Sequence, residues 1–503
     1  MHLSHYLDGG DPIRCCVIGA GGFGRSFVVH ARHLATVDAR IVLDLDPDLA
    51  AKALTDAGIE PRLIRHCRTP AEARRAWDDG NWIVGDRLEA VIELPLDVVI
   101  EATGHPEAGA RHAALAIEAG HHVALVTKEA DSVVGPGLAA MARKQGCVIS
   151  PVDGDQPALA IGLISWAETV GLEILAAGKS SEYDFVFDPT METMTSNGRC
   201  VAVPGFGERW DLPAGLDNQG HHQWLADRSR IAGALPQHAV PDLCEMSIVA
   251  NATGLLPDRP ALHYPIARLN EIAELFVPVA DGGLLTRTPA LEVFHCLRRP
   301  DEFSLAGGVF VVVRGHDRAS WQMLAEKGHL VSRRGDSAML PLPRHLLGLE
   351  AATTLLEMVR RGVPSGVAQP RPHVDLIAMA EADLAEGTTL TAHGHHHSID
   401  QVSSALVPAS ALGDDAPLPY YLAANRVLMR SVRAGEPIRV RDVAIDQSSY
   451  LWKLRQTQDA LFFAPAMSTS NMSASNMSAS SMPSGTESSI FKPSIPDANE
   501  NPR

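Results

Sequence analysis

Three glycines near the start of the chain have a spacing that suits binding of a dinucleotide pyrophosphate. Gly19, Gly21 and Gly24 form the pattern GxGxxG directly after an apolar stretch. The first permits a sharp turn, the second lets phosphates approach the backbone, and the third lets a helix pack closely on the strand. Free N–H groups at the helix N-terminus would then hold the phosphates. We expect the cofactor to contact the whole loop: Gly19, Ala20, Gly21, Gly22, Phe23 and Gly24.

An acidic residue follows these glycines at the distance expected for binding of the adenosine ribose. Asp44 ends the second predicted strand, where a carboxylate accepts hydrogen bonds from the ribose hydroxyls. It would repel a 2′-phosphate, and no arginine follows it directly, so we expect NAD in preference to NADP, which stays the alternative cofactor. Asp46 is the competing choice, because predicted strand ends shift by about 2–4 residues. A further cofactor contact is expected from Thr103 and Gly104, in the turn after the third apolar strand.

Two lysines are candidates for the base that takes the hydroxyl proton when a hydride is removed from a C–OH group. Lys128 and Lys179 each follow an apolar strand, and Lys128 is also expected to border the cofactor. Burial would lower the pKa of such a lysine toward the working pH, whereas nearby carboxylates would oppose that shift. The alternative role for either lysine is a structural ion pair.

Several polar side chains near these lysines are candidates for contact with a substrate. Loop carboxylates are expected to orient hydroxyl groups, and sharing of a divalent cation is an open alternative: Glu129 and Asp155 among the catalytic groups, Asp131 and Asp153 among the substrate contacts. Asn251 and Thr253 interrupt an apolar helical stretch and are expected at the substrate, with helix capping as the alternative. An anionic substrate would draw on a basic set, which otherwise forms solvated surface charge: Arg314, Arg333, Arg334 and His345.

Four further histidines, at positions 393 and 395–397, form a cluster that could be considered a metal-binding site. No cysteine accompanies them, and turn residues surround them. We therefore expect an exposed loop there and assign no metal ligands.

The pattern of strands and helices around the glycines and lysines predicts an α/β fold. Residues 14–155 alternate short apolar strands with helical segments, which predicts a doubly wound parallel sheet of the Rossmann type. The predicted strands are 15–19, 39–45, 98–102, 122–127 and 148–151, and the predicted helices are 23–34, 47–57, 106–119 and 136–145. A charged segment at 65–87 is expected on the surface.

The rest of the chain predicts two more domains and a tail. Residues 156–365 read as an α+β catalytic domain, with strands near 173–177 and 309–314 and helices near 158–170 and 345–360. A proline-rich linker at 363–372 leads to a small β-rich module at 373–448, and a short helix follows at 450–463. The Ser, Asn and Met repeats at 467–503 predict a disordered tail.

Composition sets the class of protein. The 503 residues are 46% hydrophobic and 20% charged, and no apolar run is long enough for a membrane span. The N-terminus lacks the pattern of a secretory signal, so a cytoplasmic protein is expected. A net charge of -17 argues against binding of nucleic acid, and the seven cysteines show neither disulfide-framework nor zinc-site spacing.

Several motifs resemble known oxidoreductases. The stretch GHHVALVTKE at 120–129 resembles the strand-plus-lysine motif of the glucose-fructose oxidoreductase and inositol dehydrogenase superfamily, which implies that Lys128 lies beside nicotinamide and substrate. The order of VIGAGGFG, IEATGHPEAG, KEADSVVGP, GDQP, AAGK, EMSIVANATGLLPD and GGVFVVV resembles homoserine-dehydrogenase-like proteins with a C-terminal SAF domain, a group that includes the deoxyxylulose-phosphate reductoisomerase-like enzymes. ADLAEGT at 382–388 and VRAGEPI at 432–438 are similar to the SAF domain itself.

Three functions follow as hypotheses. The first is an NAD-dependent dehydrogenase for a small polar hydroxy or oxo compound such as a hydroxy acid, polyol or sugar derivative. The second is a reductoisomerase that uses NADPH and a divalent metal; Asp44 and Gln156 depart from that pattern, since the resemblance implies a phosphate-binding basic cluster and a carboxylate there. The third is a catalytically silent NAD-sensing protein. The resemblance also implies a homo-oligomer.

Overall fold

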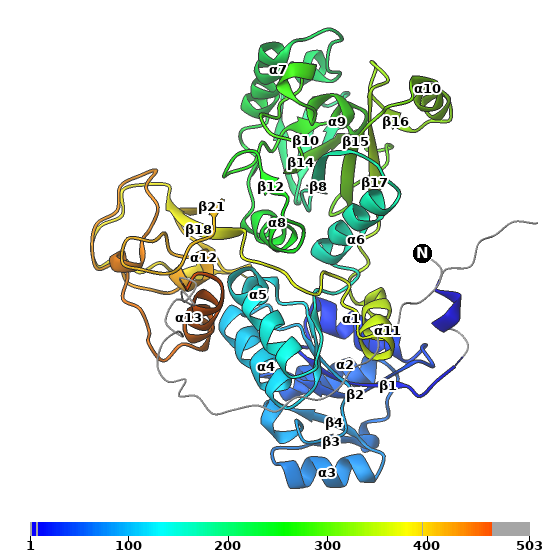
Figure 1. The fold of residues 1–503 in the computed structure, drawn as a ribbon, viewed down its shortest axis with the longest axis vertical. Coiled ribbons are helices and arrows are strands. Elements are labelled where there is room, and N and C mark those ends of the chain that lie inside the picture. The colour runs from blue at the N-terminus through cyan, green and yellow to red at the C-terminus, as the bar shows by residue number, and fades with distance from the viewer. Residues whose placement is uncertain (1–2, 7–8, 395, 465–503) are drawn as a thin grey trace, which may run out of the picture. The chain divides into compact units, whose positions relative to one another are not determined.

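A seven-stranded sheet carries the glycine loop (Figure 1). The computed structural model describes residues 3–6, 9–394 and 396–464. All neighbouring strands of this sheet run parallel. Their order is β3 (Ile64–His66), β4 (Trp82–Gly85), β2 (Val37–Leu43), β1 (Ile13–Ile18), β5 (Val98–Glu101), β6 (His122–Leu125) and β7 (Ile149–Ser150). The chain therefore leaves β1 toward one edge and returns to β5 on its other side, which is where doubly wound sheets bind their ligands.

Helices cover both faces of this sheet, because its strands are apolar on both sides. Cys16 and Ile18 face one core, whereas Cys15 and Val17 face the other. The first core is closed by α3 (Pro70–Asp78), α4 (Pro106–Glu118) and α5 (Lys128–Lys144), and the second by α1 (Gly22–Ala31), α2 (Pro47–Asp56) and α11 (Ala351–Arg361). The predicted Rossmann architecture is confirmed.

Two local predictions about this sheet were wrong. The segment at 65–87 is not a surface insertion, since it forms α3 and most of β3 and β4, and Ile83 and Val84 are buried. These strands are three and four residues long, too short for their apolar pattern to stand out among charged neighbours. The helix expected from Pro136 begins instead at Lys128 and continues through the proline. Packing of α5 against α4, α8 and α13 compensates for the backbone hydrogen bond that a proline removes.

A second, mixed sheet follows, as the expected α+β pattern requires. Its order is β11 (Arg199–Ala202), β10 (Thr193–Ser196), β9 (Phe185–Asp188), β14 (Ala290–Arg298), β8 (Ile174–Ser180), β15 (Val309–Arg314), β17 (Ser337–Leu342) and β16 (Leu330–Val331), with β12 (Leu256–Pro257) and β13 (Ile266–Ala267) beside β14. One face packs on α6 (Gln156–Thr169) and α8 (Val240–Thr253), and the other on α7 (Asn218–Ile231) and α9 (Leu269–Leu275). The short helix α10 (Arg318–Glu326) lies next to β16.

The chain then returns to the first sheet. The helix expected at 345–360 is α11, and Leu355 and Met358 on this helix pack in the same core as β1 and α1. The last segment of the second predicted domain therefore packs on the dinucleotide-binding sheet, while the domain boundaries themselves stay predictions.

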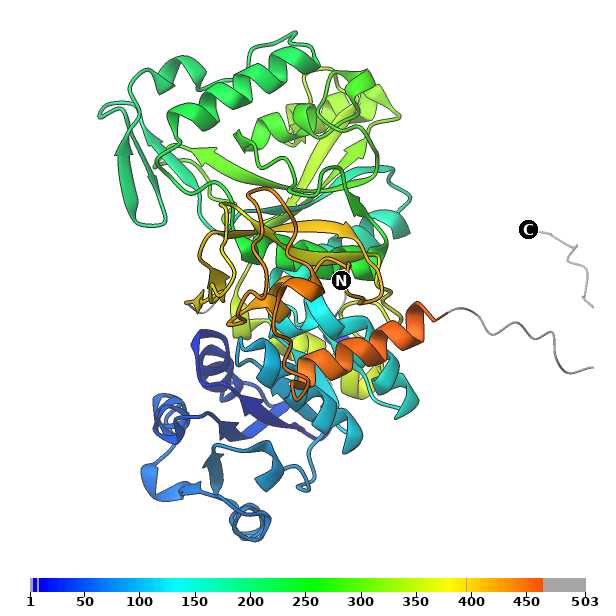
Figure 2. The same ribbon diagram turned by 90° about the vertical axis from the view of Figure 1, so that its left-hand side faces the viewer.

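The third module consists of short strands, as expected. A hairpin-like pair, β18 (Val374–Ala380) and β21 (Val402–Pro408), packs on α8 and α5, and β19 (Ala392–His393) pairs with β20 (Ser398–Ile399). Beyond α12 (Tyr420–Ala423), α13 (Tyr450–Phe462) packs on α4 and α5, confirming the last predicted helix. Figure 2 shows this yellow and orange segment against elements of both sheets. None of the described helices is long and apolar enough to cross a bilayer. The tail at 467–503 lies outside the described residues.

Candidate functional site

The glycine loop has the conformation that its sequence predicts. Gly19 has a φ of +98°, and a Cβ there would lie 2.4 Å from the carbonyl oxygen of Ala102. A Cβ at Gly24 would lie 1.9 Å from the carbonyl oxygen of Gly19, so only glycine fits at either position. At Gly21 and Gly22, by contrast, a Cβ would meet no described atom within 4 Å. The two middle glycines thus border open space at the N-terminus of α1, which is where a pyrophosphate binds in such loops.

Asp44 lies beside this loop. Its Oδ2 accepts a hydrogen bond from the backbone N–H of Ala20 at 2.8 Å, and its Oδ1 accepts one from Asp46 at 3.0 Å. The alternative residue, Asp46, caps α2 by accepting a hydrogen bond from the backbone N–H of Asp48. Asp44 is therefore the carboxylate that the glycine loop holds in place, and each of its oxygens retains a lone pair for a ribose hydroxyl.

Hydrogen bonds to neighbouring side chains hold the turn after β5 in place. The Thr103 hydroxyl donates to the buried carboxylate of Glu101 at 2.7 Å, and the backbone N–H of Gly104 donates to Thr127 Oγ1 at 3.0 Å. The main chain of Thr103 and Gly104 thus lies at the carboxyl ends of β5 and β6, next to the glycine loop on β1. The contact of this turn with the cofactor stays a prediction.

The two candidate lysines share one carboxylate. Lys128, the first residue of α5, donates to Glu245 Oε1, and Lys179, on β8, donates to Glu245 Oε2. Lys179 also forms an ion pair with Asp242 at 2.8 Å. Asp242 in turn accepts a hydrogen bond of 2.8 Å from the hydroxyl of Ser181. The side chains of Lys179, Asp242 and Glu245 are 1% exposed, whereas that of Lys128 is 16% exposed, so Lys128 is the member of this row within reach of a bound molecule.

The electrostatics of this row differ from the expectation of a lysine base. Burial alone would lower the pKa of Lys128, but the carboxylates of Glu245, Asp155 and Glu129 outweigh it and hold that pKa well above its usual value. Burial opposes the ammonium form of Lys179 as well, yet Asp242 and Glu245 raise its pKa. Burial would raise the pKa of Glu245, but the two ammonium groups lower it to about 2. Both lysines therefore carry a proton at neutral pH and suit donation rather than abstraction.

Asp242 and Glu245 were missed as site residues by the sequence reasoning. They lie three residues apart on α8, so they share one face of the helix. A signal for them was present in the sequence, because the two acids interrupt an apolar helical stretch. Such a helix is buried almost throughout, and buried acids require charged partners.

The four predicted loop carboxylates do not converge on one point. Glu129 and Asp155 are close enough to Lys128 to raise its pKa. Asp153 accepts a 2.5 Å hydrogen bond from Thr353 on α11. Asp131 faces Gly135 within its own helix and lines a small cavity. Only Glu129 and Asp155 thus belong to the lysine site, and the four do not together form a cation site among the described residues.

The pKa values of two of these acids are raised by burial. Burial raises the pKa of Glu129 to about 8, an effect that the charge of Lys128 moderates. Burial alone raises the pKa of Asp131 to about 7.

Replacing Asp131 by asparagine should therefore stabilise the protein in a pH-dependent way. The ordinary pKa of an aspartate is near 4, so between that pH and about 7 the folded protein retains a proton that the unfolded chain releases. The stability of the native protein falls as the pH rises across this window, and asparagine removes the loss. We expect Asp131→Asn to raise Tm by a few degrees at pH 8 and to leave it nearly unchanged at pH 4.5. The exposed Asp414→Asn serves as control and should show no such pH dependence.

Asn251 and Thr253 make hydrogen bonds that hold the fold together. The Asn251 side-chain oxygen accepts hydrogen bonds from the backbone N–H groups of His373 and Val374, at 2.7 and 2.9 Å. Its amide nitrogen donates to the carbonyl of Val374. Asn251 therefore ties α8 to the start of the third module instead of facing a substrate. Thr253 donates to the carbonyl of Val249 at the end of α8, in agreement with the helix-end alternative.

The three arginines proposed for an anionic substrate form ion pairs with neighbouring acids: Arg314 with Glu173 and Asp281, Arg333 with Glu274, and Arg334 with Asp336. None of them lines the large cavity described below. His345 differs, because its ring lies against Gly307 and near Gln156.

The histidine cluster is only partly an exposed loop. His393 is exposed and pairs with Asp400, and residue 395 lies outside the described residues. His397, however, contacts the carbonyl oxygen of Gly104 through Nε2 at 3.0 Å, and its ring packs edge-on against His105. His396 lines the large cavity near Glu182. The expectation of an exposed loop is thus wrong for these two histidines, because His397 packs on the turn after β5 and His396 lines the cavity.

A cavity of about 590 Å³ adjoins the row of charges. The second sheet and α8 contribute Ser181, Asp242 and His295, the segment before α8 contributes His238, and the third module contributes Glu381 and His396. Burial lowers the pKa of His238 and of His295, which leaves both rings neutral at neutral pH. The described residues that line this cavity include no lysine and no arginine. Its surface is more apolar than polar, but the hydroxyl, imidazole and carboxylate groups among its lining residues suit a small molecule that carries hydroxyl groups.

The comparison with sequence families identifies part of this region. Residues 240–351 match the family described as "Oxidoreductase DRL, catalytic domain". The match covers less than half of the chain and includes α8 with Asp242 and Glu245. A comparison with curated proteins gave no match.

Solved structures show limited similarity. They include KijD10, a 3-ketoreductase from Actinomadura kijaniata in complex with NADP (18% identity, TM-score 0.24, 36% of this chain and 51% of that chain). UDP-N-acetylglucosamine 3-dehydrogenase GnnA from Acidithiobacillus ferrooxidans is 18% identical over 35% of this chain and 48% of its own, with a TM-score of 0.23. DOX-P reductoisomerase in complex with magnesium is 18% identical over 34% and 46%, with a TM-score of 0.26. The chain thus spans about half the length of the structures it matches. These scores assign no activity. The Rossmann architecture rests on the strand order of the first sheet. The similarity to an oxidoreductase catalytic domain rests on the family match of the segment around α8.

Proposed function

We propose that this protein is an NAD-dependent oxidoreductase for a small, uncharged polar compound with a hydroxyl or oxo group. The observation that carries the proposal is the row Lys128, Glu245 and Lys179, which joins the dinucleotide-binding sheet to the cavity beside Asp242. The match of residues 240–351 to an oxidoreductase catalytic domain supports the same activity.

The residues at the glycine loop fit a nicotinamide dinucleotide. The open space at Gly21 and Gly22 suits a pyrophosphate at the N-terminus of α1, and Asp44 suits the adenosine ribose. When bound, the nicotinamide supplies or accepts the hydride. The chain itself binds the dinucleotide, holds the substrate and handles the proton.

Lys128 is the proposed proton donor. Its ammonium group is partly accessible, and its raised pKa keeps it protonated at neutral pH. Lys128 is not among the described residues that line the cavity, so the cavity would hold the part of the substrate that lies away from the reacting carbonyl. In the direction of carbonyl reduction, the Lys128 Nζ–H bond breaks as the proton passes to the oxygen of the reduced carbon, and the amine regains a proton from water. Glu245 and Lys179 position Lys128 and act through it. A positive charge next to the developing alkoxide also favours this direction.

The cavity lining supports an uncharged substrate. Phosphate groups are commonly bound by arginine or lysine, and the described lining residues of the cavity include neither. Its hydroxyl, imidazole and carboxylate groups suit hydrogen bonds to a polyol or sugar derivative. A screen of hydroxy acids, polyols, their oxo forms and sugar phosphates, with NAD or NADP and with or without a divalent metal, tests the proposal. Turnover confined to a sugar phosphate with NADPH and metal would favour a reductoisomerase instead.

Replacing Asp44 by asparagine should weaken the preference for NAD. The neutral amide no longer repels a 2′-phosphate and binds the ribose hydroxyls less strongly, so we expect the ratio of NAD to NADP affinities to fall about tenfold, about 1.4 kcal/mol. Titration of both nucleotides into the variant measures this ratio. Asp46→Asn is the matched control, because Asp46 caps α2. A shift in Asp46→Asn with none in Asp44→Asn would assign the ribose contact to Asp46.

A further inference from the structure

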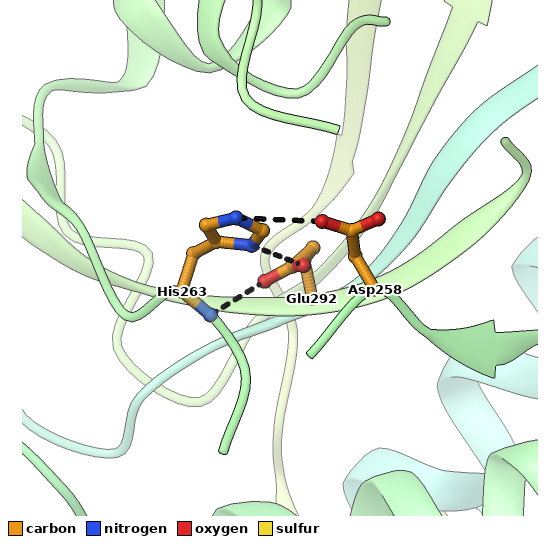
Figure 3. Close-up of side chains that lie close together, drawn as sticks. All are labelled: Asp258, His263 and Glu292. Atoms are coloured by element: carbon orange, nitrogen blue, oxygen red, sulfur yellow. Dashed lines mark hydrogen bonds and ion pairs between the residues drawn. The ribbon is translucent and has the colours of Figure 1, made fainter. Parts of the chain in front are cut away.

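Three side chains from separate segments meet beside β14 (Figure 3). Asp258 follows β12, His263 lies in the loop before β13, and Glu292 lies on β14. The side chains of Asp258 and Glu292 are 0% exposed, and that of His263 is 3% exposed. Two buried carboxylates thus lie around one buried imidazole, an arrangement that requires a compensating positive charge.

Most of the hydrogen-bonding capacity of the three groups is already used. Asp258 Oδ1 accepts hydrogen bonds from the backbone N–H groups of Thr286 and Arg287 and from the Thr286 hydroxyl, at 2.7–2.9 Å. Glu292 Oε2 accepts the backbone N–H of His263 at 3.0 Å, and Oε1 lies 2.6 Å from His263 Nδ1. Glu292 therefore fixes the orientation of the ring and accepts a hydrogen bond from Nδ1–H.

One ring nitrogen of His263 and one carboxylate oxygen of Asp258 remain without a hydrogen bond in the described part of the chain and face each other. His263 Nε2 and Asp258 Oδ2 lie 3.5 Å apart, both are buried, and neither has a hydrogen-bond partner among the described residues. With the ring proton on Nδ1, Nε2 presents a lone pair to the lone pairs of a carboxylate oxygen. Two acceptors in contact repel each other unless a positive charge, either a second proton on the ring or a metal ion, lies between them.

We propose that His263 Nε2 and Asp258 Oδ2 bind a divalent transition-metal ion of the zinc class. Adjacent ligands of a tetrahedral ion with bonds of about 2.0–2.2 Å lie about 3.3–3.6 Å apart, which matches the observed separation. The Glu292–His263 contact reproduces the carboxylate that commonly supports a metal-binding histidine. An imidazole ligand favours zinc over magnesium or calcium, and a dication neutralises both carboxylates.

This site lies apart from the proton-transfer row. Val293 on β14 pairs with Lys179 on the parallel strand β8, so these two side chains point to the same face of the sheet. Glu292, the next residue, points to the opposite face. The ion would therefore join the segment after β12 to the loop before β13, and the contact of Glu292 with His263 would connect that loop to β14, the strand next to Lys179, without contact with the substrate.

The test measures zinc in untagged, full-length protein. After removal of metal by a chelator and dialysis against zinc, we expect one tightly bound zinc per chain and a rise in Tm of several degrees. Asp258→Asn and His263→Gln should each lose the zinc and the rise in Tm. The matched control is His393→Gln, because His393 is an exposed histidine paired with an aspartate, and it should keep both. Zinc content that follows His393, or no zinc above background, overturns the proposal.

A second measurement does not depend on the folding of variants. Cobalt bound to the wild-type protein should give the visible absorption of a tetrahedral site, and X-ray absorption of the zinc form should show nitrogen and oxygen ligands including one imidazole. A sulfur ligand would place the ion at a cysteine and contradict the proposed site.

Discussion

Replacing Lys128 by methionine should lower kcat for the physiological substrate by about 10²–10⁴-fold, the usual contribution of a proton donor. Methionine keeps the length of the side chain but cannot donate a proton. Glu245 retains its ion pair with Lys179 in this variant, so the fold should survive. The measurement is nicotinamide absorbance during carbonyl reduction, together with the affinity for NAD, which should change little because the glycine loop is untouched.

Two further variants separate proton donation from charge and from general effects of substitution. Lys128→Arg keeps the positive charge, but an arginine side chain does not give up its proton in proteins, so we expect turnover to stay low. Lys144→Met changes an exposed lysine at the other end of α5 and should leave turnover unaltered. Full turnover in Lys128→Met would remove the proposed donor, and turnover in Lys128→Arg near that of the wild type would assign the residue an electrostatic role only.

Replacing Gly21 by valine should abolish nucleotide binding without unfolding the protein. A Cβ at Gly21 meets no described atom within 4 Å, and the backbone φ of -69° suits any residue. The valine side chain would therefore occupy only the space assigned to the pyrophosphate. We expect the affinity for NAD to fall at least 100-fold, which eliminates the rise in Tm that NAD causes in the wild type.

Gly162→Val is the matched control for this substitution. Gly162 lies on the exposed face of α6, and a Cβ there also meets no described atom within 4 Å. It should retain NAD binding. A Gly21→Val protein that still binds NAD as tightly as the wild type would place the dinucleotide elsewhere.

The sequence predicted the elements whose chemistry is local. A glycine loop, the strand before it and the helix after it are adjacent in the chain, so spacing alone located Gly19, Gly24 and Asp44. The strands β3 and β4 escaped detection because segments of three and four residues carry too little hydrophobic periodicity. The start of α5 was placed too late because Pro136 suggested a first turn, whereas packing on three helices lets the helix pass through it.

The charged row could not be predicted because it depends on packing between distant elements. Lys128 and Glu245 are separated by 117 positions and meet only because α5 packs on α8. That contact also reverses the predicted electrostatics, since the carboxylates raise a pKa that burial alone would lower. Asp258, His263 and Glu292 are likewise brought together by the pairing of short strands with β14. The oligomeric state and the resemblance of the third module to a SAF domain stay predictions.

Calorimetric titration of NAD and NADP into the wild-type protein tests the central claim most directly. The account predicts binding of one NAD per chain at the glycine loop, with NADP bound more weakly because its 2′-phosphate meets Asp44. Folded protein that releases no heat with either nucleotide across a range of temperatures would contradict it.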